Sequence, residues 1–279
     1  LISTLRIPLF LKLYCQLSAT AEISTPGEIL YAFFNECNRE YSARIRLSEI
    51  SNAQQQFRVP HATNFITEKM QLFIMDFLIP EIGWYMVKRE LYAVDKETIK
   101  DIIEPVLTRE KDTDICGKYG RAFFREYHRG NDGSINTQTY AKQLMELNSN
   151  NNYIEDIVEY CVYSLGIFYV NNQEYSFIHQ HIRDFFAALK IITDIKFAMG
   201  IYHTDKVSAM ECVHELNNTL LDEVVSRFMS DLSRTLSMKH GYYFYLAALE
   251  IYRNIYNDEA ALGVKNIAHI IYEVQGDLS

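Results

Sequence analysis

Glycine and proline are scarce in this chain, whose 279 residues contain 11 glycines and 5 prolines. Both residue types interrupt helices and build turns, so their scarcity leaves room for long uninterrupted helical segments. Apolar residues recur at three- and four-residue spacing over much of the chain, which is the pattern of amphipathic helices. The sequence therefore predicts a mainly helical protein.

Paired cysteines and an excess of basic charge are also lacking. The five cysteines are scattered and never form a C-x-x-C pair, which indicates reduced thiols in a cytoplasmic protein. With 27 basic and 36 acidic residues the net charge is −9, so nucleic acid and anionic membranes are disfavoured as partners. The apolar run "IPLFLKLYC" is too short to span a membrane and carries Lys12. We expect a cytoplasmic protein without a membrane partner.

The signature motifs of nucleotide and hydrolase chemistry are missing from the sequence. It contains no G-x-x-x-x-G-K-[ST], G-x-S-x-G, H-E-x-x-H or G-x-G-x-x-G. The chain begins with Leu1 rather than Met, inside an apolar helical pattern, so we expect a fragment of a longer protein. The fragment is not expected to be an enzyme, because any nucleotide chemistry would depend on residues outside it.

Local signals predict where several helices begin. Thr25 and Glu28 form a capping box, with Pro26 at the first helical position. Asp95 is positioned to cap the segment "VDKETIKDIIEPVL". Further helices are expected over residues 65–92 (around Pro80), 118–128, 136–147, 153–165, 204–216, 219–238 and 241–256.

One segment, "GIFYVNNQEYSFIH", has a clear strand signal. Two β-prone runs, Ile167–Val170 and Tyr175–Ile178, flank the polar turn "NNQE", which predicts a β-hairpin. Several helices followed by a hairpin suggest a winged-helix unit. We therefore expect a mainly α fold in which helical bundle segments flank a winged-helix domain with one small β-hairpin.

Two loops have a superficial likeness to ligand-binding motifs. In "YHRGNDGSINTQTY", aligning Gly133 with the glycine of a calcium loop places Thr139 where a bidentate glutamate is required, so a turn between helices is preferred. In "ICGKYGRAFF", the G-x-x-G spacing is that of a KH loop, but the strands of that fold are missing nearby. We interpret it as a loop at the start of a helix.

Two histidines stand in "YSFIHQHIRDFFAALK", at His179 and His181. On one strand they would share a face and could bind a metal, with Asp184 as a third ligand. The following apolar residues have helical spacing, however, and a helix that begins at Gln180 would separate the two rings. Composition alone therefore favours histidines that pack against neighbouring side chains over histidines that bind zinc.

The same stretch resembles the end of the winged-helix domain in NACHT-type signal-transduction ATPases, the STAND group that includes NOD-like receptors. The family pattern F-[IL]-H-x-x-[FI]-[QR]-[DE]-[FY]-[FL]-A-A is matched over Phe177–Ala188. Upstream, "LISTLRIPLFLKLYC" resembles the family segment "NPLLLTLLC" in the helical domain after the nucleotide-binding core. Pro8 takes the place of the proline that packs against adenine, and Ile7 replaces the usual asparagine.

The resemblance implies a division into three parts. Residues 1–60 would end the first helical domain, 61–180 would form the winged-helix domain with a helical insertion, and 181–279 would form a second helical domain leading to a sensor region. The segment would be a non-catalytic regulatory scaffold that holds the resting state of a STAND ATPase. Its main partner would be the nucleotide-binding domain of the same parent chain.

The resemblance also implies a nucleotide contact. His179 would bind the β-phosphate of ADP, because an imidazole N–H can donate to an anionic oxygen. ADP or ATP with magnesium would belong to the full-length parent, and we expect no tight binding by the fragment. Exchange of ADP for ATP would release the contact and permit homo-oligomerisation in response to a sensed ligand that the sequence does not identify.

Two other readings of the sequence remain open. A winged-helix nucleic-acid binder with a helical dimerisation region would need a basic recognition helix, around Lys118–Arg129. A metal-dependent hydrolase would use the H-x-H pair.

Overall fold

The computed structural model describes residues 7–17, 23, 25–51, 71, 74–108, 153–201, 209–210, 214, 216–235, 241–256 and 262–276. Its contacts divide the chain into two compact units, Leu1–Asn35 with Gln180–Ser279, and Glu36–His179. The described residues are mainly helical with one small antiparallel sheet, which confirms the predicted fold class. Within them, no helix is both long enough and apolar enough to cross a membrane.

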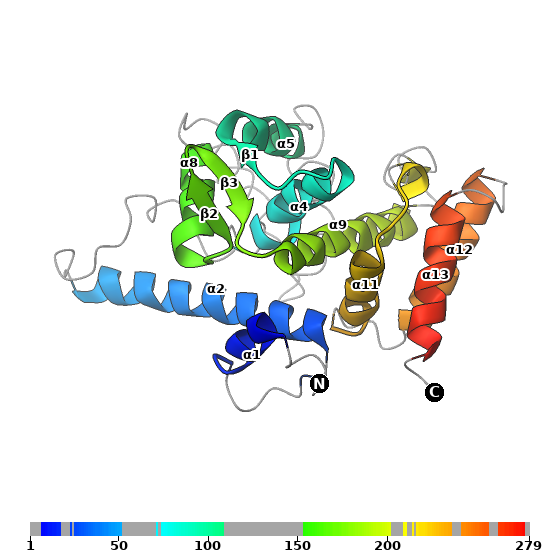
Figure 1. Cartoon of the computed structure of the whole chain (residues 1–279), viewed down its shortest axis with the longest axis horizontal. Coiled ribbons are helices and arrows are strands. Elements are labelled where there is room, and N and C mark those ends of the chain that lie inside the picture. Colours follow the sequence, from blue (N-terminus) through cyan, green and yellow to red (C-terminus); the bar gives the residue numbers. More distant parts are fainter. Residues whose placement is uncertain are drawn as a thin grey trace, which may run out of the picture. The chain divides into compact units, whose positions relative to one another are not determined.

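The first unit, Leu1–Asn35 with Gln180–Ser279, is helical in its described part (Figure 1). Within it, α11 packs against α9 and α13, and α12 packs against α13. The contacts group the N-terminal segment with the C-terminal helices in this unit. The helices are α1 (Pro8–Tyr14), the start of α2 (Pro26–Ser51), α9 (Gln180–Ile201), α11 (Glu223–Thr235), α12 (Gly241–Tyr256) and α13 (Leu262–Gly276).

The start of α2 is fixed by two sets of hydrogen bonds. The Thr25 N–H donates to Glu28 Oε2 at 3.0 Å, and the Glu28 N–H donates to Thr25 Oγ1 at 3.3 Å. These bonds confirm the predicted capping box. The Gly27 N–H donates to Oδ2 of Asp231, a buried residue of α11, at 2.9 Å. A carboxylate from α11 therefore satisfies a free N–H at the positive end of α2.

Aromatic packing forms part of the core of the first unit. Phe34 of α2 contacts Phe185 and Phe186 of α9, with ring centroids 6.0 and 5.2 Å apart. All three side chains are almost fully buried. The apolar side of α9 thus packs against the N-terminal half of α2, which lies about 150 positions earlier in the sequence.

The C-terminal helix α13 is held by a buried asparagine, Asn266. Its Oδ1 accepts from the Leu221 N–H at 3.2 Å, and its Nδ2 donates to the carbonyl oxygens of Leu216 and Thr219 at 3.0 and 2.7 Å. One side chain therefore satisfies three backbone groups in the turn before α11. The sequence did not predict α13, whereas the predicted helices 219–238 and 241–256 correspond to α11 and α12.

The second unit, Glu36–His179, combines helices with the sheet (Figure 1). Where the sequence predicted one helix over 65–92, the structure has a π-helical turn followed by an α-helix whose first turn contains Pro80. The predicted helix over 153–165 likewise changes to a π-helical turn at Tyr160. The elements are η3 (Ile74–Leu78), α4 (Ile79–Lys88), β1 (Val94–Asp95), α5 (Lys96–Thr108), α8 (Tyr153–Glu159), η4 (Tyr160–Ser164), β2 (Phe168–Asn171) and β3 (Glu174–Phe177).

The sheet has the strand order β1-β3-β2, and both pairs are antiparallel. The predicted hairpin is confirmed: Phe168 lies opposite Phe177, and Asn172 and Gln173 form the turn with φ of 50° and 68°. Such a left-handed pair suits the twist of a two-residue hairpin. β1, for which the sequence analysis predicted no strand, adds a third strand opposite β3.

The short strand β1 also starts a helix. Val94 lies opposite Tyr175, and the next residue, Asp95, accepts a hydrogen bond from the Thr98 N–H at 2.7 Å through Oδ1. This bond confirms the predicted cap of α5. Among the described elements of this unit, a helix, a strand, further helices and a hairpin that returns beside the first strand follow one another in the order of a winged helix. The calcium-like and KH-like loops and the predicted helices 118–128 and 136–147 lie outside the described residues.

Candidate functional site at the strand-to-helix junction

The predicted phosphate contact, His179, lies in the two-residue bend between β3 and α9. It is half-buried and is the last residue of the second unit. The residue before it is fixed by the sheet, because the Ile178 N–H donates to the carbonyl oxygen of Ile167 at 2.9 Å. Phe177, at the end of β3, is buried and contacts Phe168 edge-to-face with ring centroids 4.9 Å apart. The hairpin therefore sets the backbone position of His179.

His181 has a different environment, in the first turn of α9. Its ring stacks on Phe10 of α1, with centroids 5.8 Å apart, and meets Phe228 of α11 edge-to-face at 6.3 Å. The sequence favoured a packing role for the two histidines, and these contacts show packing for His181. His181 thus holds α1, α9 and α11 together within the first unit.

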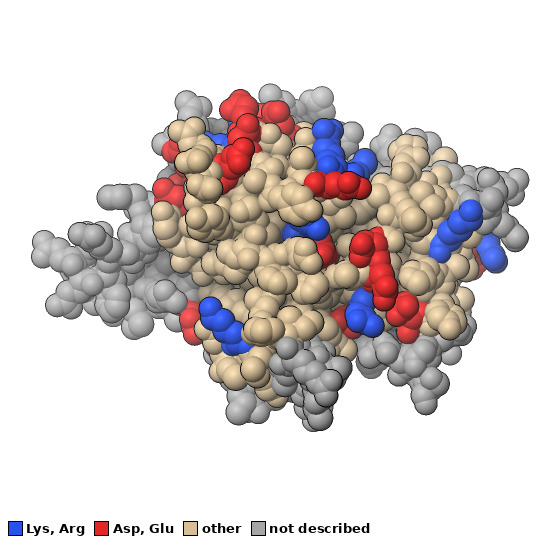
Figure 2. Space-filling model, viewed as in Figure 1, with Lys and Arg blue, Asp and Glu red and all other residues tan. Residues whose placement is uncertain are grey.

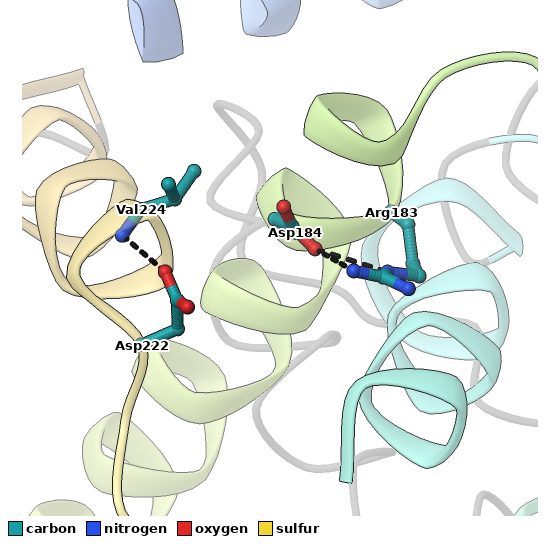
Figure 3. Close-up of polar contacts among 4 residues, drawn as sticks. All are labelled: Arg183, Asp184, Asp222 and Val224. Atoms are coloured by element: carbon teal, nitrogen blue, oxygen red, sulfur yellow. Dashed lines mark hydrogen bonds and ion pairs between the residues drawn. The ribbon is translucent and has the colours of Figure 1, made fainter. Parts of the chain in front are cut away.

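An ion pair follows on the next turn of α9. Arg183 donates to Oδ1 of the buried Asp184 through Nε at 3.0 Å and through Nη2 at 2.8 Å (Figure 3). Burial raises the pKa of the Asp184 carboxyl. Arg183, and more weakly His181, oppose that rise, whereas Asp222 adds to it. Figure 3 shows Asp222 at the start of α11, where it accepts from the Val224 N–H at 2.7 Å.

The other predicted site residue, Pro8, occupies the first position of α1 and is exposed. Phe10 and Leu13 bury the opposite side of this short helix, while Ile7 and Leu11 are 37% and 47% exposed. The exposed side of α1 around Pro8 therefore combines apolar residues with Lys12. Pro8 belongs to the first compact unit and His179 to the second, so each is described within its own unit.

The structure also reveals buried charges that the sequence analysis missed. Lys190 and Asp194 form an ion pair in the interior of α9, and both residues are buried. Their spacing of four residues was a readable signal for a helical pair. Asp231, which caps α2, gave no local signal, because its partner Gly27 is 204 positions away.

Side chains that could bind a metal ion are the last feature of the junction. Within the part of the chain that the structure describes, no group of three or more His, Cys, Asp and Glu residues is arranged to hold a metal ion. Asp184, the third ligand considered for an H-x-H site, is engaged by the guanidinium of Arg183. The residues described at the junction therefore offer packing and hydrogen bonding.

Comparisons with models of protein families, with curated proteins and with solved structures found no match for this chain. Functional inference therefore rests on the junction itself and on the resemblance of its sequence.

Proposed function

We propose that this chain is the regulatory helical and winged-helix portion of a STAND-type ATPase, acting as a nucleotide-state switch without catalysing a reaction itself. The observation that carries the proposal is the place of His179, half-buried in the bend that follows the wing strand β3 and directly precedes α9. An imidazole at that position can donate to an anionic oxygen of a neighbouring domain. The nucleotide domain of the same parent chain would supply ADP or ATP with magnesium.

The residues after His179 support a switching role because they anchor the helix that follows. His181 packs on Phe10 and Phe228, and Arg183 holds the carboxylate of Asp184. A change in the position of His179 would therefore act on a helix that is fixed within its own unit. Exchange of ADP for ATP would remove the favourable contact and shift the population toward an oligomerisation-competent state in the cytoplasm.

The proposal is tested on the parent protein that includes the nucleotide domain. ADP retained through purification is released by denaturation and quantified for wild type, His179→Ala and the matched control His269→Ala, which alters an exposed histidine of α13. One lost hydrogen bond to a charged group corresponds to about 10- to 100-fold weaker ADP binding. Equal retention of ADP by the two variants would contradict the proposal.

A second test needs only the reading frame. The codons ahead of Leu1 are expected to encode a P-loop lysine and an acidic Walker B strand. A reading frame that lacks both would overturn the assignment, whatever the properties of His179.

A further inference from the structure

The helix before the wing has an unusual distribution of charge for a winged-helix unit. In many helix-turn-helix proteins the corresponding helix enters the DNA groove and carries basic groups. Here Glu155, Asp156 and Glu159 are the charged residues of α8, and none is basic. Figure 2 shows acidic side chains gathering over the part of the molecule where Figure 1 places α5, α8 and the strands. This helix would repel a phosphate backbone.

Two of these carboxylates lack a compensating cation within the part of the chain that the structure describes. Lys96 of α5 pairs with Glu155. Among the described residues, neither Asp156 nor Glu159 forms an ion pair with a basic side chain. Burial, followed by repulsion from Glu159 and Glu155, raises the pKa of Asp156. A cation from outside the chain would relieve this repulsion.

Aromatic side chains are exposed on η4 and β2, the two elements that follow the acidic helix along the chain. Tyr163 of η4 is 69% exposed and lies four residues after Glu159, on the side of the helix opposite the buried Cys161. β2 packs against η4, and its Tyr169 and Val170 are 60% and 40% exposed. The Ile167 N–H, just before β2, donates to the carbonyl oxygen of Cys161 at 2.9 Å, which ties strand and helix together.

We propose that the exposed face of α8 and η4, together with β2, is a docking surface for an arginine-rich segment of a partner protein. This inference goes beyond the proposed nucleotide switch and does not depend on it. Arginine suits the surface better than lysine, because a guanidinium pairs with two carboxylate oxygens at once and also stacks on tyrosine rings. Asp156 and Glu159 supply the carboxylates, while Tyr163 and Tyr169 supply the rings.

The test measures binding of a fluorescent arginine-rich peptide to the 279-residue protein by anisotropy, at low and at physiological salt. The double variant Asp156→Lys/Glu159→Lys is expected to bind the peptide at least about tenfold more weakly than the wild type does. Its matched control, Glu250→Lys/Glu273→Lys on α12 and α13, makes the same change in net charge and is expected to bind as the wild type does. Equal weakening in both double variants would show general electrostatic attraction and overturn the proposal.

A second comparison tests the aromatic half of the surface. Wild type is expected to bind the arginine peptide more tightly than a lysine peptide of equal charge, and Tyr163→Ser/Tyr169→Ser is expected to lose that preference. A preference that persists in the tyrosine variant would refute the role of the rings. Circular dichroism checks that each variant is folded, and tight binding of duplex DNA by the wild type would overturn the choice of a protein partner.

Discussion

The contact between Gly27 and Asp231 offers a sharp test of how the first unit is packed. In Gly27→Ala the new Cβ would lie 2.5 Å from Cβ of Asp231 and 3.1 Å from its Oδ2. Each Cβ is bonded directly to its backbone, so no side-chain rotation can relieve this overlap. α2 or α11 must shift, and that shift would lengthen the 2.9 Å hydrogen bond from the Gly27 N–H.

The magnitude follows from the two effects. Overpacking costs about 1–3 kcal/mol, and loss of a buried hydrogen bond to a charged acceptor costs about 1.5–3 kcal/mol. The better helix propensity of alanine offsets at most about 1 kcal/mol. We therefore expect Gly27→Ala to lower the free energy of unfolding by about 2–5 kcal/mol.

Urea unfolding followed by circular dichroism measures this loss as a lower midpoint with an unchanged slope. The control is Gly166→Ala, in the second unit, where φ is +62° and nothing lies within 4 Å of the added Cβ. Its cost comes from backbone strain alone and should be about 1–2 kcal/mol. A loss below about 0.5 kcal/mol for Gly27→Ala would refute the close approach of the two helices.

Three further predictions concern single side chains. Asn266→Ala removes three hydrogen bonds worth about 1 kcal/mol each, so it should lower the free energy of unfolding in urea by about 3 kcal/mol. The control Asn218→Ala, at an exposed site, should lower it by less than about 1 kcal/mol. Equal losses in the two variants would refute the anchoring of α13 by Asn266. His181→Ala removes two ring contacts and should lower the free energy of thermal unfolding by about 1–3 kcal/mol. His179→Ala should lower it by less, and a larger loss for His179→Ala than for His181→Ala would contradict the packing role of His181. Burial raises the pKa of Asp184 above 3.8, so the folded state binds the carboxyl proton more tightly than the unfolded chain does. The stability that this proton contributes is lost as pH rises through the folded-state pKa. Asp184→Asn cannot titrate, so its stability relative to wild type should rise over that pH interval, and a relative stability that falls would contradict the burial effect.

Several features of the fold could be predicted because their signals lie within a few residues. The capping box of Thr25 and Glu28, the Asp95 cap and the hairpin turn each depend on neighbours no more than four positions apart. Backbone groups at helix ends and turns need nearby partners, so sequence spacing alone identifies them. The helix α13 had such a signal as well, in the spacing of Val264, Ile267 and Ile270, and was overlooked.

The candidate site was predictable only in part. The sequence placed His179 at a strand-to-helix junction and separated it from His181, because strand and helix periodicities change there. The contacts of His181 with Phe10 and Phe228 could not be predicted, since they join segments about 170 and 50 positions away. The exposure of Tyr163 and Tyr169 could not be predicted either, because it depends on how the helices and strands pack. The predicted basic helix, Lys118–Arg129, lies outside the described residues.

The sequence by itself determined the helical class, the helix caps and the hairpin, since each follows from local backbone geometry and periodic apolar residues. Tertiary structure alone decided that β1 joins the sheet, that Asp231 caps α2 and that the N-terminal segment packs with the C-terminal helices. β1 is two residues long and has too little pattern of its own, and its pairing depends on β3, about 80 positions away. Such long-range contacts are selected by complementary shape and by the satisfaction of buried polar groups, which no local pattern encodes.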